Sequence, residues 1–200
     1  MQGVIAVAAC SLILGGCAIH RQTETPRSAS EEMLLSSAAD HAAEAIGRSM
    51  PSDSKLYLDT SGFTATDDKY AIGAIRDALL RHGNRLVDKR SDAAVIVEIR
   101  SGALATDDRE TLVGIPSFAI PLPLTGAQIE TPKIALADEF TQLGVAKFAA
   151  TATDATSGAL VASSTPQYGF AHRTKYILLF VFGWTKDDGL PDPSKDPHGG

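Results

Sequence analysis

The sequence of 200 residues contains little of what several protein classes require. Two cysteines are too few for the disulfide framework of a small secreted protein. Basic residues are outnumbered, with 18 Lys and Arg against 24 Asp and Glu, and the net charge of -6 argues against nucleic acid as a partner. The mean hydropathy is close to zero, which excludes a protein with several membrane spans.

The sequence also lacks the short motifs that are typical of catalysis. It has no G-x-S-x-G pattern of serine nucleophiles and no glycine-rich phosphate loop. Its five histidines are scattered, without the H-x-x-H or cysteine spacing that binds zinc. We therefore expect no enzymatic activity, no cofactor and no metal site. The alternative is a hydrolase whose residues are distant in sequence, such as Glu98, Asp107 and His172.

What the sequence does have is an uncharged amino-terminal segment. Residues 1–16 carry no charged side chain, and the apolar run from Val4 to Leu14 is about 11 residues long. A spanning helix needs roughly 20 residues, whereas this length suits the apolar core of a signal peptide. The L-G-G-C motif that ends at Cys17 resembles the lipobox of bacterial lipoprotein precursors. The resemblance implies cleavage between Gly16 and Cys17 and acylation of Cys17.

This amino terminus also predicts a location. In lipoproteins of this kind, Ala18 after the acylated cysteine implies transfer to the outer membrane, on its periplasmic face. Acyl chains hold a protein at a bilayer once two or more anchoring signals combine. Cys10 would be removed with the signal. We expect a signal peptide, a lipidated tether, one folded domain and a disordered tail, over residues 1–16, 17–29, 30–184 and 185–200 respectively.

The first half of the predicted domain combines helices and strands. Ser28 and Glu31 have the spacing of a capping box, and apolar residues recur every three or four positions over residues 30–49, which predicts a helix. A second helix is expected between Asp67 and Gly83. Strands are predicted over residues 55–60, 85–88 and 93–104. This order indicates an α/β (α+β) fold, with two main helices packed on a single mixed sheet.

The second half of the predicted domain is less regular. Residues 109–132 carry four of the ten prolines, so we interpret them as an ordered apolar loop or an interaction arm outside the sheet. A hairpin is expected over residues 144–163, with its turn at residues 154–158. Residues 176–184 (YILLFVFGW) are almost without a polar side chain, which favours a fully buried strand.

Two sets of residues are candidates for a binding surface. Glu98 and Arg100 fall on one face of the predicted strand 93–104, and they form either a ligand-binding ion pair or a solvated salt bridge. The segment 112–124 is more apolar than the surface of a small protein requires, and its prolines prevent ordinary sheet pairing. We expect this segment to contact a partner protein or a membrane through Ile115, Pro116, Phe118, Ile120 and Pro121.

Two resemblances to known families extend this interpretation. The segment Leu86–Ile99 and the turn Asp154–Gly158 resemble the periplasmic α/β domain of TolB amino-terminal domains and curli-channel (CsgG-like) lipoproteins. A closer resemblance is to an uncharacterised family of bacterial lipoproteins, known as a domain of unknown function. The segments that carry this second resemblance are Leu58–Thr60, Val97–Leu104, Leu112–Pro116, Thr131-Pro132 and Leu143–Lys147. The first resemblance implies an envelope location and a tendency to self-assemble or to bind partners.

We therefore expect an outer-membrane-anchored periplasmic lipoprotein that acts as a non-catalytic interaction or assembly component of the cell envelope. Its partners would be the membrane, through the lipid anchor, and envelope proteins or further copies of itself. One alternative is a subunit of an outer-membrane channel or secretion assembly. That function requires amphipathic strands of ~9–11 alternating residues, of which the sequence shows no convincing pair. The other alternative is an envelope hydrolase.

Overall fold

The computed structural model describes residues 27–122, 127–179 and 181–188. The predicted signal peptide, the cleavage site at Gly16 and Cys17, and residues 189–200 of the predicted tail lie outside this part of the chain. In the part that the structure describes, no helix is both long enough and apolar enough to cross a membrane.

The helices and strands follow one another in an order that begins with helix and strand and ends with strands alone. In chain order they are α2 (Ala29–Ser49), β1 (Lys55–Asp59), α3 (Asp68–Arg81), β2 (Arg85–Leu86), a short 3-10 helix η1 (Arg90–Asp92), β3 (Val95–Ile115), β4 (Ala119–Pro121), β5 (Gln128–Glu130), β6 (Ile134–Asp154), β7 (Leu160–Ser163), β8 (Gln167–Leu178) and β9 (Phe182–Asp187).

Both predicted helices are confirmed, as are the capping box that starts α2 and the glycine that follows α3. The Ser28 hydroxyl accepts a hydrogen bond from the backbone N–H of Glu31, and the Glu31 carboxylate accepts one from the backbone N–H of Ser28 at 2.6 Å. This reciprocal pair is the capping box at the start of α2. At the end of α3, Gly83 has a φ of +84°, which a glycine adopts without strain.

The main sheet is mixed, as the predicted fold class requires. Its strand order is β2-β1-β3-β6-β8-β9, and β7 pairs with β6. β1 lies parallel to both β2 and β3. The pairs β3–β6, β6–β8 and β8–β9 are antiparallel. β4 and β5 form a separate two-stranded ribbon. The α/β class with two helices on one sheet is therefore confirmed.

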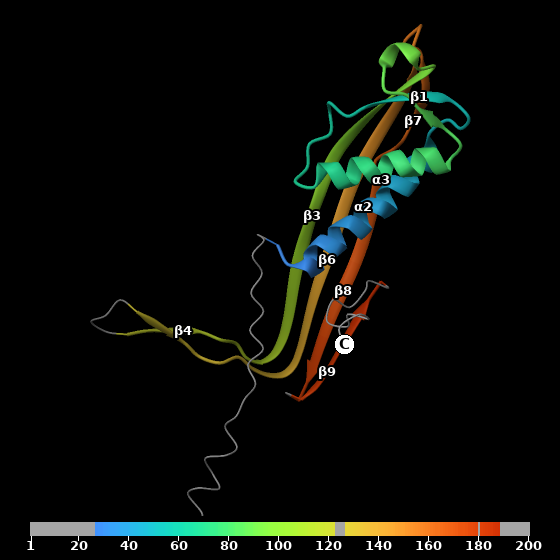
Figure 1. Ribbon diagram of the computed structural model, residues 1–200. Coiled ribbons are helices and arrows are strands. Elements are labelled where there is room, and N and C mark those ends of the chain that lie inside the picture. Colours follow the sequence, from blue (N-terminus) through green and yellow to red (C-terminus); the bar gives the residue numbers. More distant parts are fainter. Residues whose placement is uncertain (1–26, 123–126, 180, 189–200) are drawn as a thin grey trace, which may run out of the picture.

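The two helices cover only part of one face of this sheet (Figure 1). α2 packs across β6 and β8, and α3 packs beside α2. The core between the layers includes Phe148, whose ring packs at an angle against that of Phe63, with the ring centroids 5.1 Å apart. A Cβ atom at Gly169 would collide with the Ala38 carbonyl of α2, and one at Gly144 with the Leu34 carbonyl. These glycines let the helix lie directly on the strands.

The longest strands reach far beyond the helices. β3 and β6 have 21 residues each and pair from Val95 with Asp154 to Ile115 with Ile134. The prediction that the third strand ends at residue 104 is therefore wrong, and so is the expected loop at residues 109–115. The sequence around Asp107 to Glu110 is charged at every position, because this part of β3 is exposed on both faces. A strand without a buried face has no alternating pattern to detect.

The prediction of one buried strand over residues 176–184 is also wrong. β8 ends at Leu178 and β9 begins at Phe182, so the apolar segment forms the turn of a hairpin. Leu178, Leu179, Phe182 and Trp184 are exposed, and Val181 reaches 75%. Residues 185–187 of the predicted tail belong to β9. Apolarity over nine residues indicated a buried segment, but the described part of the chain provides no element to cover it.

Candidate interaction surface

The ribbon of β4 and β5 has one apolar side. Ile120 pairs directly with Ile129, so the two side chains share a face. Phe118 and Leu122 lie two residues on either side of Ile120 and therefore point the same way. We call residues 117–122 and 127–131 the arm, and Phe118, Ile120, Leu122 and Ile129 its apolar face. The opposite face of the arm carries Ala119, Pro121, Gln128 and Glu130.

The apolar face of the arm has no cover in the described part of the molecule. Its four side chains are between 37% and 54% exposed. The arm projects away from the main sheet, beyond the end of β3 and β6 (Figure 1). A two-stranded ribbon alone in water is marginally stable, and its apolar side chains gain free energy once they are buried. This geometry is typical of a segment that is covered in a complex.

The turn between β8 and β9 forms a second exposed apolar surface, which we call the tip. It comprises Leu178, Leu179, Val181, Phe182 and Trp184, each at least 42% exposed. Trp184 stacks on Tyr176 of β8 with a ring distance of 5.1 Å. Leu179 has a φ of +50°, a backbone conformation that residues other than glycine rarely adopt. The tip therefore displays large apolar groups on a tight turn.

The arm and the tip lie at the same end of the sheet, far from the helices, but at its two different edges (Figure 1). The arm continues from β3 and β6, whereas the tip belongs to β8 and β9. A shallow groove of about 210 Å³ lies between them and is lined in part by Val113, Ala137 and Leu178. Exposed apolar surface is therefore concentrated at one end of the molecule, which is typical of an interaction site.

Charged residues fix the base of the arm. The Lys133 ammonium donates hydrogen bonds to Glu110 at 2.5 Å and to Asp138 at 2.6 Å. Asp138 is 6% exposed, so its carboxylate depends on this lysine for compensation. The hydrogen bonds to Asp138 and then to Glu110 raise the pKa of Lys133 above its usual value. The clamp ties the start of β6 to β3 and sets the direction in which the arm leaves the sheet.

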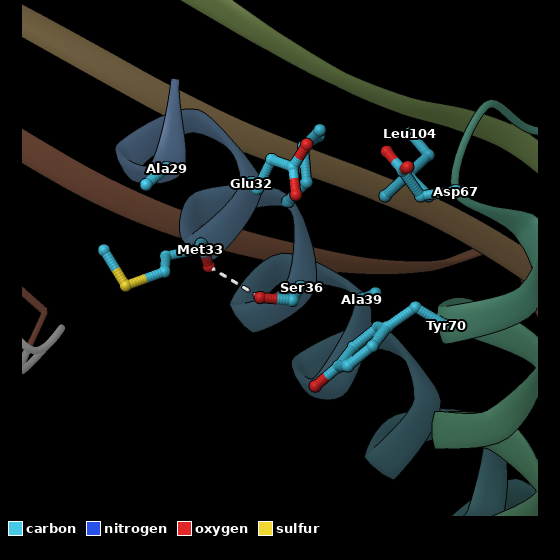
Figure 2. A pocket seen from close by; sticks show the side chains of 9 residues that line it. Ala29, Glu32, Met33, Ser36, Ala39, Asp67, Tyr70 and Leu104 are labelled. Atoms are coloured by element: carbon cyan, nitrogen blue, oxygen red, sulfur yellow. Dashed lines mark hydrogen bonds between the residues drawn. The ribbon is translucent and has the colours of Figure 1, made fainter. Parts of the chain in front are cut away.

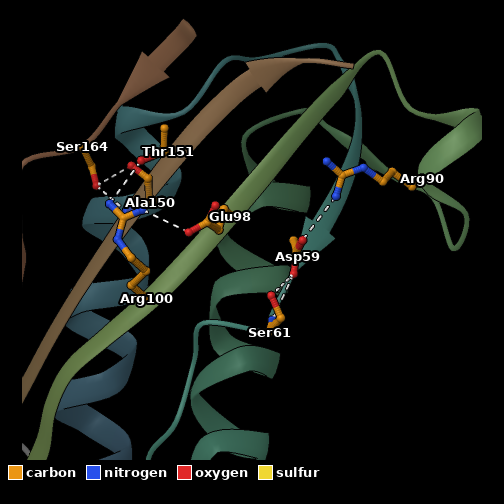
Figure 3. A network of polar contacts seen from close by, with 8 residues as sticks. All are labelled: Asp59, Ser61, Arg90, Glu98, Arg100, Ala150, Thr151 and Ser164. Atoms are coloured by element: carbon orange, nitrogen blue, oxygen red, sulfur yellow. Dashed lines mark hydrogen bonds and ion pairs between the residues drawn. The ribbon is translucent and has the colours of Figure 1, made fainter. Parts of the chain in front are cut away.

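Glu98 and Arg100 lie where the sequence predicts, on the face of β3 without helices. Arg100 pairs with Glu98 at 3.4 Å and donates to the Thr151 hydroxyl at 3.1 Å (Figure 3). Both side chains are about half exposed. Nearby, hydrogen bonds from the Ser61 hydroxyl and then its backbone N–H lower the pKa of Asp59, and Arg90 contributes to the same shift. The Glu98 pair is a solvated salt bridge, and neither residue is near the arm.

A groove that the sequence did not indicate lies between the two helices. It has a volume of about 400 Å³ and is lined by Met33, Ser36 and Ala39 of α2, by Tyr70 of α3 and by Leu104 of β3 (Figure 2). Burial raises the pKa of Tyr70, and its hydrogen bond to Asp40 adds to this effect. The groove is mainly apolar and open to solvent. Its residues are spread over three elements, so no sequence motif could identify it.

The structure does not bring the three residues of the predicted hydrolase site together. Asp107 and His172 both pair with Leu143, so they lie two strand spacings apart, roughly 10 Å. Glu98 is nine residues further along β3, on the order of 30 Å away. His172 instead hydrogen-bonds Asp188 at 2.8 Å through Nδ1. Within the described residues, no group of three His, Cys, Asp or Glu side chains is placed to hold a metal ion.

The five predicted contact residues of segment 112–124 lie in or next to the arm. Phe118 and Ile120 belong to its apolar face, whereas Pro121 lies on the other face of β4. Ile115 and Pro116 are at the point where the arm leaves β3, and both are exposed. The sequence did not identify Ile129 or the tip as part of this surface. The apolar run at residues 176–184 was the available signal, and it was assigned to the core.

Comparison with known families places the chain in a family whose function is unknown. Residues 12–170 match the model of a family of unknown function, DUF6655. No curated protein matches the chain. The family match includes β3, the arm and β6 and ends within β8, before the tip. Since the match covers most of the chain, this protein belongs to the DUF6655 family of unknown function.

Proposed function

We propose that this protein is a lipid-anchored component of the outer membrane, on its periplasmic face, whose function is non-catalytic binding or assembly. The observation that carries the proposal is the apolar face of the arm, which has no cover in the described structure. The lipobox-like sequence that ends at Cys17 supports the location. The anchor would keep the folded domain at the membrane, and the arm and tip would supply its contacts.

The charge of the arm favours a protein partner over a lipid surface. Between residues 116 and 132 the only charged residue is Glu130. Peripheral contacts with anionic lipids depend on clusters of Lys and Arg, which this segment lacks. A flat apolar face with a polar reverse side suits a protein surface of similar shape.

The proposal can be tested on the arm with a matched pair of double variants. Ile120→Thr with Ile129→Thr removes the apolar face but keeps residues that favour strands. Gln128→Thr with Glu130→Thr is the matched control, because it introduces the same two threonines on the opposite face of the ribbon. Crosslinking mass spectrometry in native envelopes should show partner links through the arm in the wild type and the second variant. The first variant should lose them. Equal links in both variants would contradict the proposal.

The anchor is tested separately by a change at Cys17. After the predicted cleavage, Cys17 carries the only thiol of the mature chain, and Cys17→Ala removes it. Without an acyl anchor the protein should move to the soluble periplasmic fraction. Cys10→Ala is the control, because that residue lies in the predicted signal and should not affect anchoring. Retention of the Cys17→Ala protein in the membrane fraction would exclude a lipid anchor.

A second candidate function is a subunit of a channel or secretion assembly. The length of β3 and β6, 21 residues each, favours it more than the sequence alone did. Asp107 and Arg109 point to one face of β3, and Asp108 and Glu110 to the other. A membrane-crossing strand needs one uniformly apolar face. The charge on both faces therefore favours a binding function for this hairpin.

A further inference from the structure

The main sheet has two unpaired edges beside the interaction surface. β1 pairs with β3 only from Val95 to Glu98, so in the described chain the rest of β3 has no strand on that side. At the other end of the strand order, the described residues give β9 one strand partner, β8. Unpaired edges expose rows of backbone N–H and C=O groups that can pair with another chain.

The two edges match each other in direction and position. β3, β6, β8 and β9 alternate in direction, so β9 runs antiparallel to β3. Along the pairing registers, Asp187 of β9 is level with Asp108 of β3, and Phe182 is level with Val113. The β9 edge of one copy can therefore lie beside the β3 edge of a second copy in the same orientation. The contact would be an antiparallel pair like those within the sheet.

The apolar surfaces are placed so that the same contact covers both. The arm leaves the molecule on the side of the β3 edge, away from β8 and β9 (Figure 1). The tip lies at the β9 edge, at the same end of the sheet. A second copy placed beside β3 brings its tip next to the arm of the first copy.

We infer that this chain assembles with copies of itself head to tail, with the β9 edge and tip of one copy against the β3 edge and arm of the next. The inference rests on the proposed binding function and names its partner. Because the two contacting surfaces differ, each copy keeps one free surface of each kind, and the contact repeats until a ring closes or a filament grows.

Charge selects the register of this contact. The level arrangement places Lys186 opposite Arg109, which is a repulsive pair. If β9 of one copy slides two residues along β3 of the other, toward the helices, Lys186 lies opposite Asp107 and Trp184 lies opposite Arg109. Both are attractive pairs. If β9 slides two residues the other way, Lys186 lies opposite Thr111, which offers it no opposite charge. The first slide is therefore the favoured register, with Lys186 and Asp107 on the face without helices.

Disulfide trapping tests this register in the full-length chain, purified in detergent micelles. Copies with Asp107→Cys are mixed with copies with Lys186→Cys, oxidised, and the linked peptides are identified by mass spectrometry. Within one chain these positions are three strand spacings apart, roughly 14 Å, which is too far for a disulfide. A 107–186 link therefore joins two copies. Asp108→Cys is the matched control, because its side chain points to the other face.

A charge exchange provides a second measurement on the same pair. Asp107→Lys and Lys186→Glu should each weaken association about five- to tenfold, measured by light scattering or sedimentation. The double variant should return to within about twofold of the wild type, because every interface regains an opposite-charge pair. Both residues are exposed and distant from the core, so the folded domain should be retained.

The outcomes separate this inference from the proposed function. A 107–186 link together with rescue by the double variant supports head-to-tail assembly. A wild-type protein that is monomeric throughout, equal linking at position 108, or no rescue would overturn it. A monomer that binds phosphatidylethanolamine–phosphatidylglycerol vesicles through the arm would also overturn it. The proposed function fails on different evidence, namely envelope crosslinks that are the same with and without the apolar face of the arm.

Discussion

The two ends of the sheet are built from similar apolar residues but differ in whether a helix covers them. At the end beneath the helices, Phe148 and Val97 are fully buried, and small residues such as Gly169 allow α2 to lie close. At the other end, Phe182, Trp184 and Ile129 are equally apolar but more than half exposed. The residue types do not differ, so burial here depends on whether the chain supplies a covering helix. The uncovered end has apolar groups in excess of what its own fold can bury.

The largest expected effect separates two phenylalanines. Phe148→Ala removes a fully buried ring and its contact with Phe63, and should lower the free energy of unfolding by about 3–5 kcal/mol. Phe182→Ala makes the same chemical change at a side chain that is 61% exposed, and should change stability by about 0.5 kcal/mol or less. Urea unfolding of both variants measures the difference. Similar losses would mean that the tip belongs to the core of the domain.

A smaller effect is expected from a pair of glycines. Gly169→Ala would force a methyl group against the Ala38 carbonyl of α2, and should cost about 1–3 kcal/mol. Gly183→Ala in β9 meets its nearest heavy atom at 3.7 Å, an ordinary contact, and should leave the unfolding midpoint unchanged. A Gly169→Ala protein of wild-type stability would indicate that α2 can move away from β8 at no cost.

The smallest effect concerns the end of β9. Asp188 accepts hydrogen bonds from the backbone N–H of His172 at 2.7 Å and from its ring at 2.8 Å. Burial pushes the pKa of Asp188 upward, but these hydrogen bonds outweigh it, and the pKa falls below the ordinary value of 3.8. The carboxylate therefore stabilises the fold above that value. Its contribution is lost as the pH falls through the lowered pKa.

Hydrogen exchange measures this contact directly. Asp188→Asn should increase the exchange rate of β9 amides several-fold at neutral pH, with little change in the amides of β6. Wild-type β9 should show the same increase relative to β6 when the pH is brought below the lowered pKa of Asp188. Because Asp188 is 44% exposed at its side chain, the effect on global stability should stay within about 0.5 kcal/mol. Equal exchange in wild type and variant would show that the ladder of β8 and β9 alone holds this edge.

The elements that the sequence predicted well are those with one buried face. α2 and α3 have apolar stripes and polar ends, and β1 alternates buried and half-buried residues, so periodicity located them. β3 beyond Leu104 was missed because neither face is buried there. β8 was missed for a related reason, since glycine and arginine are buried on its helix side while Tyr168 and Phe170 are exposed.

The candidate surface was predicted in part. Pro116, Pro121 and the apolar residues between them marked an interaction arm, because proline excludes a central strand. The tip was assigned to the core, since sequence cannot show whether a third layer exists above an apolar strand. The nearness of the tip and the arm follows from pairings of β6 with β8 that span about 40 residues, and local patterns carry no information about them.

The long hairpin has a further consequence for how this family can vary. The arm closes the β3–β6 pair at the end remote from the helices, so its residues form a loop whose two ends are already held together. Loop-closure entropy grows slowly, by about 0.6 kcal/mol for each doubling of length. Insertions, deletions and exchanges of the arm should therefore be tolerated while the helix-covered half stays folded. The protein can be regarded as a constant frame with a replaceable segment, and under the proposed binding function a new partner would require a new arm but no new fold.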